Sequence, residues 1–221
     1  MIFVPHKPSD GRRSTWPPII VANVIVIVIV IALIVWFAGG KRHFIPRHWA
    51  VVDAGVVYRS GELSPSLVET TWEKNGIKSV VNLMGPQGDD PDAERAAAHA
   101  AHKLGVNRQF FPLIGDGTGD VEQYVGAIKA IVDARSQHRP VVVHCATGTY
   151  RTGGVVAAYR TLVEGWTGKA AYDEMIAEGV RPGPDTPLMV YLNKNIATIA
   201  QRLVEEGVIE KAPDPLPHFG P

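Results

Sequence analysis

The chain opens with a polar segment that is followed by one long apolar run. Residues 1–18 are rich in proline and charge and have no periodic apolar face, which predicts a disordered tail. In 19–38 only Asn23 is strongly polar. About twenty apolar residues at helical rise match the thickness of the hydrocarbon core of a bilayer. We therefore predict a transmembrane helix over 19–38 and a juxtamembrane linker over 39–48.

The rest of the chain alternates short β-branched runs with segments of helical period. The expected strands are 51–58, which forms a hairpin with its turn at 53–55, and then 77–83, 106–112 and 141–143. The expected helices are 64–74, 93–104, 120–135, 152–164, 168–178 and 184–205. This alternation predicts an α/β domain over 49–206 with a central, mainly parallel sheet and helices on both faces. The proline-rich tail over 207–221 is expected to be disordered.

The stretch 141–153 carries the candidate chemistry. A buried strand leads into a loop that holds Cys145, the single cysteine of the chain, and Arg151 follows six positions later. The backbone N–H groups of a tight loop that opens a helix point inward and form a cradle for a tetrahedral oxyanion. Such surroundings favour a thiolate over a thiol, and the planar guanidinium of Arg151 can hold two phosphoryl oxygens. The pattern predicts an anion site with a nucleophile in it.

The residues around Cys145 have complementary parts in this prediction. His144 is expected to support the loop by hydrogen bonding, and Thr152 places a hydroxyl where it can help the sulfur to leave. A cysteine that only packed at the end of a strand would leave Arg151 and the neighbouring glycines unexplained. The predicted phosphate-binding loop comprises Ala146, Thr147, Gly148, Thr149, Tyr150 and Arg151.

Two strings of residues carry a family resemblance. His-Cys-x5-Arg-Thr-Gly, at 144–153, resembles the signature loop of the cysteine-dependent protein tyrosine phosphatase superfamily. Val-Tyr-Arg-Ser-Gly, at 57–61, resembles a segment of its small dual-specificity branch. The likeness covers roughly residues 50–205 and implies the α/β fold of a dual-specificity phosphatase. We interpret Arg59 as structural, and Met84 stands where relatives often have an arginine, so that loop supports no inference about substrate contacts.

Thiolate attack on a phosphoester also needs an acid that protonates the departing oxygen. In the resembling family this acid is an aspartate on a loop between a strand and the helix that precedes the signature strand. Asp116 and Asp120 both fit that description, in a glycine-rich loop suited to moving over the site. Because an aspartate at 120 is an ordinary helix N-cap, Asp116 is the predicted acid and Asp120 the alternative. Both also suit plain turns.

The implied reaction requires no metal or other cofactor. Cys145 attacks phosphorus in line, Arg151 and the loop N–H groups hold the equatorial oxygens, and Asp116 protonates the leaving group. Water then hydrolyses the phosphocysteine, with Asp116 as the base. The 22 basic and 22 acidic residues cancel, so the composition gives no reason to expect a nucleic-acid partner.

The uncharged side chains of the signature loop bear on the substrate. Phosphatases of this superfamily that act on multiply phosphorylated inositols resemble each other in carrying lysines there. The neutral loop therefore favours phosphotyrosine, and then phosphoserine or phosphothreonine, on a protein partner. An inositol phosphate stays open, as does a phospholipid because of the membrane helix. A pseudophosphatase that only binds its partner is a further alternative, whereas a rhodanese-like sulfurtransferase does not explain the Arg-Thr-Gly ending.

The charges beside the apolar run leave its orientation open. Three basic residues precede it and three follow it: Lys7, Arg12 and Arg13, then Lys41, Arg42 and Arg47. A signal peptide has an apolar core of only about 7–15 residues, which favours an uncleaved anchor, although a cut near Ala38 stays open. A catalytic thiolate is better preserved in a reducing compartment. We therefore expect a single-pass membrane protein whose catalytic domain faces the cytoplasm.

Overall fold

The computed structural model describes residues 17–37, 40–86, 88, 90–181, 183 and 186–221. The backbone contacts divide the chain into two compact units, Met1–Lys41 and Arg42–Pro221. The predicted disordered tail lies, except for its last two residues, outside the described residues. Each unit is therefore described by itself.

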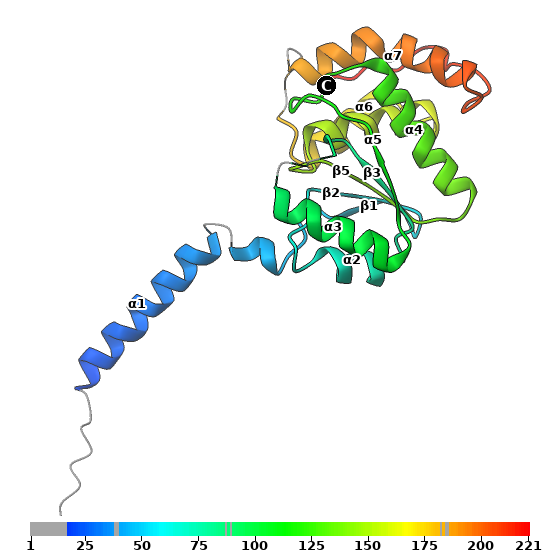
Figure 1. Cartoon of the computed structure of the whole chain (residues 1–221). Coiled ribbons are helices and arrows are strands. Elements are labelled where there is room, and N and C mark those ends of the chain that lie inside the picture. Colours follow the sequence, from blue (N-terminus) through cyan, green and yellow to red (C-terminus); the bar gives the residue numbers. More distant parts are fainter. Residues whose placement is uncertain (1–16, 38–39, 87, 89, 182, 184–185) are drawn as a thin grey trace, which may run out of the picture. The chain divides into compact units, whose positions relative to one another are not determined.

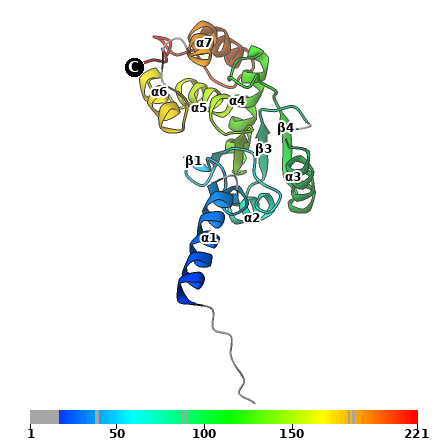
Figure 2. The ribbon, with the colours of Figure 1, turned by 90° about the vertical axis from the view of Figure 1, so that its left-hand side faces the viewer.

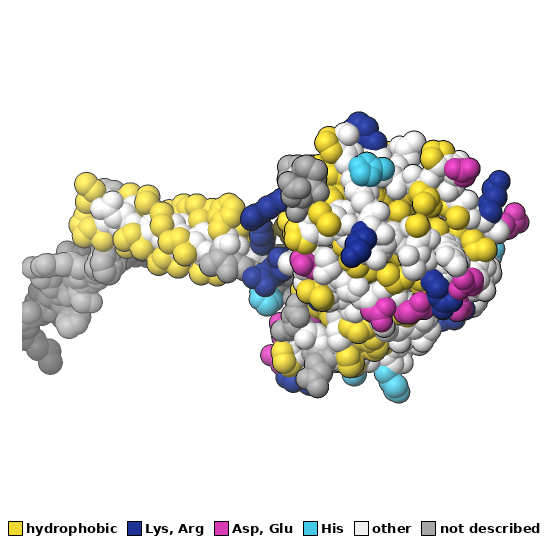
Figure 3. Space-filling view, turned by 90° about the horizontal axis from the view of Figure 1, so that it is seen from above, with side chains coloured by type: hydrophobic (Ala, Val, Ile, Leu, Met, Phe, Trp, Pro, Cys, Tyr) yellow, Lys and Arg dark blue, Asp and Glu magenta, His cyan; other side chains and the backbone are white. Residues whose placement is uncertain are grey.

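The first unit contains the helix α1 (Pro18–Phe37). Proline is tolerated at a helix start, because the first N–H groups have no partner within the helix. Hydrophobic side chains cover most of the visible side of α1 (Figure 3), and the large apolar side chains of 19–37 are exposed. Within the described residues, Ile19–Phe37 is the one stretch long and apolar enough to cross a membrane. Its extent agrees with the predicted span, apart from Ala38, which lies outside the described residues.

The second unit is built on a five-stranded sheet in the order β1-β2-β5-β3-β4. The strands are β1 (Ala50–Asp53), β2 (Val57–Ser60), β3 (Ser79–Asn82), β4 (Asn107–Phe110) and β5 (Val141–His144). β1 pairs with β2 antiparallel, and the pairs β2–β5, β5–β3 and β3–β4 are parallel. The predicted α/β fold is confirmed, with a mixed sheet in which the hairpin β1–β2 adds an antiparallel edge to four parallel strands.

The central strand β5 is apolar on both sides because helices cover both faces of the sheet. Val141 and Val143 pack into one core, and Val142 points into the other. His144 at the end of β5 is level with Ser60 of β2 and Asn82 of β3. The loop that follows β5 therefore leaves the middle of the sheet, at the edge where the parallel strands end.

The helices lie in two layers (Figures 1 and 2). The smaller layer holds α2 and α3, and the larger holds α4, α5, α6 and α7. Their bounds, with those of the short 3-10 helix η1, are η1 (Gly40–His43), α2 (Val68–Lys74), α3 (Pro91–Leu104), α4 (Val121–Ser136), α5 (Tyr150–Leu162), α6 (Gly168–Ala177) and α7 (Pro187–Glu205). The helix predicted over 64–74 begins only at Val68, since the Ser64 hydroxyl pairs with Ser66 and caps no helix.

A nearly buried arginine fixes α5 behind the sheet. The guanidinium of Arg160 donates to the carboxylates of Glu164 and Glu174 at 2.6 and 2.8 Å, and to the carbonyl of Val52 at 2.7 Å. It also stacks on the ring of Trp166, with 4.1 Å between the guanidinium carbon and the ring centroid. One charge thus joins α5 to α6 and β1, and a buried charge needs this many partners to be tolerated.

The prediction that 207–221 is disordered is wrong for the end of the chain. Phe219 is 1% exposed and belongs to the larger core. The side chain of Asn193 in α7 bonds both the N–H and the carbonyl of Phe219, at 2.8 and 2.9 Å. A Cβ at position 168 would lie 2.1 Å from the carbonyl oxygen of His218, so only glycine lets the tail approach α6. Burial of the Phe219 ring and its bonds to Asn193 hold the end of the chain on the domain despite its proline content.

We expect Phe219→Ala to destabilise the domain, by up to about 3–5 kcal/mol, because it empties a core site. If the tail of the variant undocks from the domain, the loss of stability is limited to the free energy with which the tail docks. Thermal unfolding of the full chain in detergent micelles, followed by tryptophan fluorescence, measures the effect. Leu216→Ala is the matched control, since Leu216 is 42% exposed in the same tail, and it should change stability by less than about 0.5 kcal/mol. Equal melting temperatures for the two variants would contradict a docked tail.

Candidate active site

Cys145 lies where the central strand meets the following helix. β5 ends at His144, α5 begins at Tyr150, and the loop between them joins the C-terminal edge of the sheet to a helix N-terminus. The first N–H groups of a helix have no acceptor within the helix, and they carry the positive end of its dipole. Cys145 is 1% exposed. The predicted site residues 144–152 are thus brought together by one strand-loop-helix segment.

The loop is pressed against the end of β2. Gly148 has a φ of 80°, and a Cβ there would lie 2.6 Å from the amide nitrogen of Gly61. A Cβ on Gly61 would in turn meet the carbonyl oxygen of Thr147 at 2.9 Å. Two glycines are therefore needed for the two backbones to approach this closely. This contact joins the two strings that carry the family resemblance.

Three successive carbonyl groups of the loop are bound from outside it. Ala146 accepts from the N–H of Glu62 at 3.2 Å. Thr147 accepts from the imidazole of His48 at 2.6 Å, and Gly148 accepts from the guanidinium of Arg59 at 2.8 Å. In a planar trans peptide the N–H points opposite to the carbonyl. The N–H groups of residues 147–149 are therefore turned away from these outside donors, and that of Thr149 faces the hydroxyl of Thr147 at 3.4 Å.

The position of the cysteine sulfur agrees with this orientation. The N–H of Gly148 donates to Sγ of Cys145 at 3.2 Å. Burial is the largest single influence on the thiol and opposes its ionisation, but the side chain and N–H of Thr152, the charge of Arg151 and the N–H of Gly148 together outweigh it. Together these interactions place the pKa of Cys145 below its ordinary value. The site therefore favours a thiolate, which is the nucleophilic form.

Arg59 has structural contacts, as the sequence led us to expect, and one of them is with the signature loop. Its side chain is 1% exposed beneath the loop, and its Nε lies 3.8 Å from a carboxylate oxygen of Glu178 at the end of α6. Burial lowers the pKa of Arg59, and Glu178, Glu174 and the Cys145 thiolate oppose that shift. The signal in the sequence was a charged residue inside an otherwise apolar strand, because such a residue needs buried partners.

His144 is enclosed at the base of the loop. Burial, with smaller contributions from the charges of Arg108 and Arg151, lowers the pKa of His144 to about 4. The imidazole is therefore neutral at physiological pH, and it adds no positive charge beside the thiol. The predicted supporting part of His144 stays a prediction, as do the roles of Arg151 and Thr152. Thr152 is fully buried in the first turn of α5, and Arg151 is partly buried.

The loop with the two candidate acids touches the signature segment. A Cβ on Gly117 would lie 3.0 Å from the carbonyl oxygen of Tyr150, and the hydroxyl of Tyr124 donates to the Gly117 carbonyl at 2.5 Å. Asp116, the preceding residue, accepts from the N–H and the hydroxyl of Thr118 at 2.9 and 2.8 Å. Asp120 accepts from the N–H of Glu122 at 3.0 Å and is the N-cap of α4. The cap expected at Asp120 is confirmed, while the choice of acid stays a prediction.

The described residues hold no group of three His, Cys, Asp or Glu side chains placed to bind a metal. Cys145, Arg151 and the N–H of Gly148 lie in one short segment, an arrangement that can bind a tetrahedral anion. A phosphoryl group has this shape and charge.

Comparison with known proteins agrees with the site. A family model described as "Polymorphic toxin system, DSP-PTPase phosphatase" matches residues 62–167. Inositol diphosphatase DSP4 of Arabidopsis thaliana is 25% identical over 138 residues, which cover 62% of this chain and 66% of the relative. Dual specificity protein phosphatase TpbA of Pseudomonas aeruginosa is 38% identical over 64 residues, which cover 29% of this chain and 28% of the relative. The chain thus spans about two thirds or less of the length of these curated relatives.

Solved structures share the fold. The crystal structure of P. aeruginosa TpbA matches with a TM-score of 0.57 at 22% identity, covering 72% of this chain and 91% of that one. The core catalytic domain of the PP-IP phosphatase SIW14 from S. cerevisiae matches with a TM-score of 0.59 at 15% identity, covering 76% and 97%. The match of the family model and the likeness to these proteins support a place for the chain in the cysteine-dependent protein tyrosine phosphatase superfamily, in its dual-specificity-like branch. Members of this class are phosphoric monoester hydrolases.

The lowered pKa of Cys145 predicts a pH dependence of alkylation. The thiol of the full chain should react with iodoacetamide with a midpoint at lower pH than that of an exposed cysteine, since its pKa is lowered and the thiolate persists to lower pH. Thr152→Val removes a hydroxyl that favours the thiolate, so the midpoint should move to higher pH. Thr161→Val is the matched control, because its buried hydroxyl bonds the Ala157 carbonyl in the same helix. A midpoint unaffected by Thr152→Val would exclude this role of the hydroxyl.

Proposed function

We propose that this chain is a membrane-anchored protein phosphatase that hydrolyses phosphotyrosine, and also phosphoserine or phosphothreonine, through a phosphocysteine intermediate. The observation that carries the proposal is the signature loop, in which outward carbonyls turn the N–H groups inward around Cys145. Such a cradle stabilises the negative charge that is shared by the phosphoryl oxygens in the transition state.

The proposed reaction has two steps. The Cys145 thiolate attacks phosphorus in line, the bond to the ester oxygen breaks, and Asp116 gives its proton to the departing oxygen. Water then attacks the phosphocysteine, gives a proton to Asp116 and releases inorganic phosphate, while Thr152 stabilises the returning thiolate. Arg151 and the loop N–H groups hold the equatorial oxygens through both steps. Every proton that leaves one group is taken up by another within the site.

The uncharged loop supports a singly phosphorylated substrate. Ala146, Thr147, Thr149 and Tyr150 contribute no side-chain charge that could bind a second phosphate. A TpbA variant has been solved with pTyr, which supports the same choice.

A second candidate is an inositol phosphate or phosphoinositide substrate. It is favoured by the relatives, since DSP4 is named an inositol diphosphatase and SIW14 a PP-IP phosphatase. A binding module without turnover is the third candidate. All three candidates would use the same oxyanion cradle, so the fold does not distinguish them. The substrate distinguishes the first two, and the lack of turnover distinguishes the third.

The catalytic proposal predicts distinct effects of three variants on the full chain in detergent micelles. Cys145→Ser should lower kcat for an aryl phosphate by about a thousandfold or more, because the nucleophile is lost. Asp116→Asn should lower kcat by about a hundredfold for a phosphate ester with a poor leaving group, and less for one with a good leaving group, since only the poor one needs a proton. It should also remove the fall in rate at high pH that reports the general acid.

Asp120→Asn is the matched control, because asparagine caps a helix as well as aspartate does. If Asp120→Asn shows the leaving-group dependence and Asp116→Asn does not, the acid is Asp120. The wild-type chain in the same detergent micelles should hydrolyse a phosphotyrosine peptide faster than a diphosphorylated inositol. The opposite order would assign the inositol substrate, and vanadate binding without turnover would assign the binding module.

We propose that α1 anchors the protein and that the domain faces the cytoplasm. Full-length protein in cell membranes should resist extraction at alkaline pH, whereas Ile27→Lys combined with Ile31→Lys should not, because each lysine at mid-bilayer costs about 2.5–3.5 kcal/mol. Val190→Lys, at an exposed position of α7, is the control. In a Cys145→Ser chain that carries Leu216→Cys, labelling by a membrane-impermeant maleimide in intact cells would contradict the cytoplasmic orientation.

A further inference from the structure

The short segment between η1 and β1 is bonded to the signature loop. The carbonyl of Arg47 accepts from the N–H of Gly61 at 2.7 Å, which fixes the segment beside the end of β2. The next residue, His48, places its Nδ1 at 2.6 Å from the carbonyl oxygen of Thr147. The partners His48 and Thr147 are 99 residues apart in the sequence. The segment expected only to link the membrane helix to the domain thus contacts the site.

The acceptor in this hydrogen bond determines which ring nitrogen of His48 carries the hydrogen. A carbonyl oxygen can only accept a hydrogen bond, so Nδ1 of His48 must carry the hydrogen. At 2.6 Å the bond is short for an N–H donor. The imidazole is on the exposed side of the loop, and it makes this bond without entering the anion cradle.

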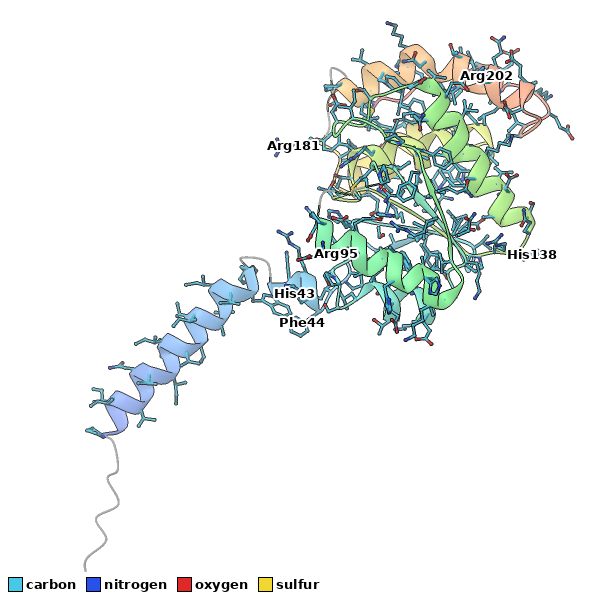
Figure 4. All side chains as sticks on the ribbon, in the orientation of Figure 1. His43, Phe44, Arg95, His138, Arg181 and Arg202 are labelled. Atoms are coloured by element: carbon cyan, nitrogen blue, oxygen red, sulfur yellow. The ribbon has the colours of Figure 1, made fainter. Side chains whose placement is uncertain are left out.

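The backbone of His48 is held in a conformation that suits few residues. Its φ is 43°, in the left-handed region, where non-glycine residues are uncommon and asparagine, aspartate and histidine are enriched among them. The described residues hold one other non-glycine at positive φ, His138, with a φ of 52°. His138 precedes β5, at the opposite edge of the sheet from the signature loop (Figure 4). It provides a matched comparison for a histidine at positive φ outside the site.

The carbonyl that His48 binds belongs to the Thr147–Gly148 peptide, whose orientation decides whether its N–H faces the Cys145 sulfur. The Thr147–Gly148 peptide carries the N–H that donates to the Cys145 sulfur. Glycine adopts both signs of φ readily, so a peptide that precedes glycine can rotate at little cost. Rotation would take the N–H off the sulfur and place a carbonyl oxygen there instead. A donor fixed on the outer side of the loop opposes that rotation.

We infer that His48 is a positioning residue that holds the Thr147–Gly148 peptide with its N–H toward the anion and the thiolate. It acts from the linker that follows the predicted membrane helix, a segment with no other assigned part in the site. The inference rests on the proposed function, because it gives the loop the task of binding a phosphoryl group. His48 touches neither the substrate nor the sulfur and acts through the backbone of the loop.

Three variants of the full chain in detergent micelles test this role. His48→Gly removes the donor and keeps a residue that accepts positive φ. His48→Asn keeps an N–H donor at the δ position and also tolerates positive φ. His138→Gly removes a histidine from the same backbone conformation elsewhere. Each is measured for vanadate affinity, for the pH midpoint of Cys145 alkylation, for kcat/KM with an aryl phosphate and for the melting temperature.

We expect His48→Gly to weaken vanadate binding and to lower kcat/KM by about three- to tenfold, the usual value of one hydrogen bond. The alkylation midpoint should rise, because the Gly148 N–H no longer stabilises the thiolate. His48→Asn should return all three quantities to within about twofold of the wild type, and His138→Gly should leave them unchanged.

The inference is overturned if folded His48→Gly keeps the wild-type affinity and alkylation midpoint, or if His48→Asn melts like the wild type yet fails to restore them. Turnover is scored separately from binding. If the wild type binds vanadate but releases no phosphate, the phosphatase proposal fails while the affinity and alkylation comparisons still decide the role of His48. If the wild type does not bind vanadate, the loop is no oxyanion cradle and the inference fails with it.

Discussion

The site depends on the orientation of a few peptide planes. A peptide group cannot turn its carbonyl and its N–H to the same side, so an inward N–H requires an outward carbonyl with a partner of its own. Glu62, His48 and Arg59 supply those partners for Ala146, Thr147 and Gly148. The anion cradle is therefore prepared by donors on its outer side, before any ligand arrives. Preorganised donors of this kind stabilise charge without a reorganisation cost during the reaction.

The buried charges near the loop also have partners of their own. Arg59 is buried close to the thiol, where an isolated charge would be very unfavourable. Glu178 lies beside it, and the Gly148 carbonyl accepts from it. Arg160 of α5 is held by Glu164, which follows α5, by Glu174 of α6 and by the carbonyl of Val52 in β1. The helix that follows the signature loop is thereby joined to the sheet and to its neighbour.

The local patterns of the sequence predicted the elements and the contiguous part of the site well. The runs of valine placed β5, the apolar run placed α1, and the helical periods placed the described helices α3 to α7 to within a few residues. The exception was α2, which begins later because Ser64 bonds Ser66. Composition misled at the C-terminus, where one phenylalanine and the paired amide of Asn193 dock a proline-rich tail. Composition averages over a segment, whereas docking depends on a single anchor and its cavity.

The sequence by itself predicted the candidate nucleophile Cys145, the candidate anion-binding Arg151 and the loop between them, because strand, loop and helix N-terminus are consecutive and their geometry is local. It also predicted the long apolar helix α1, because length and apolar composition are properties of one continuous segment. Only the tertiary structure decided which residues support the loop. Arg59 and His48 meet it across 89 and 99 residues, and no local period records a hydrogen bond between segments so far apart. Their partners are set by the order of the strands in the sheet, which places the end of β2 and the linker beside the end of β5.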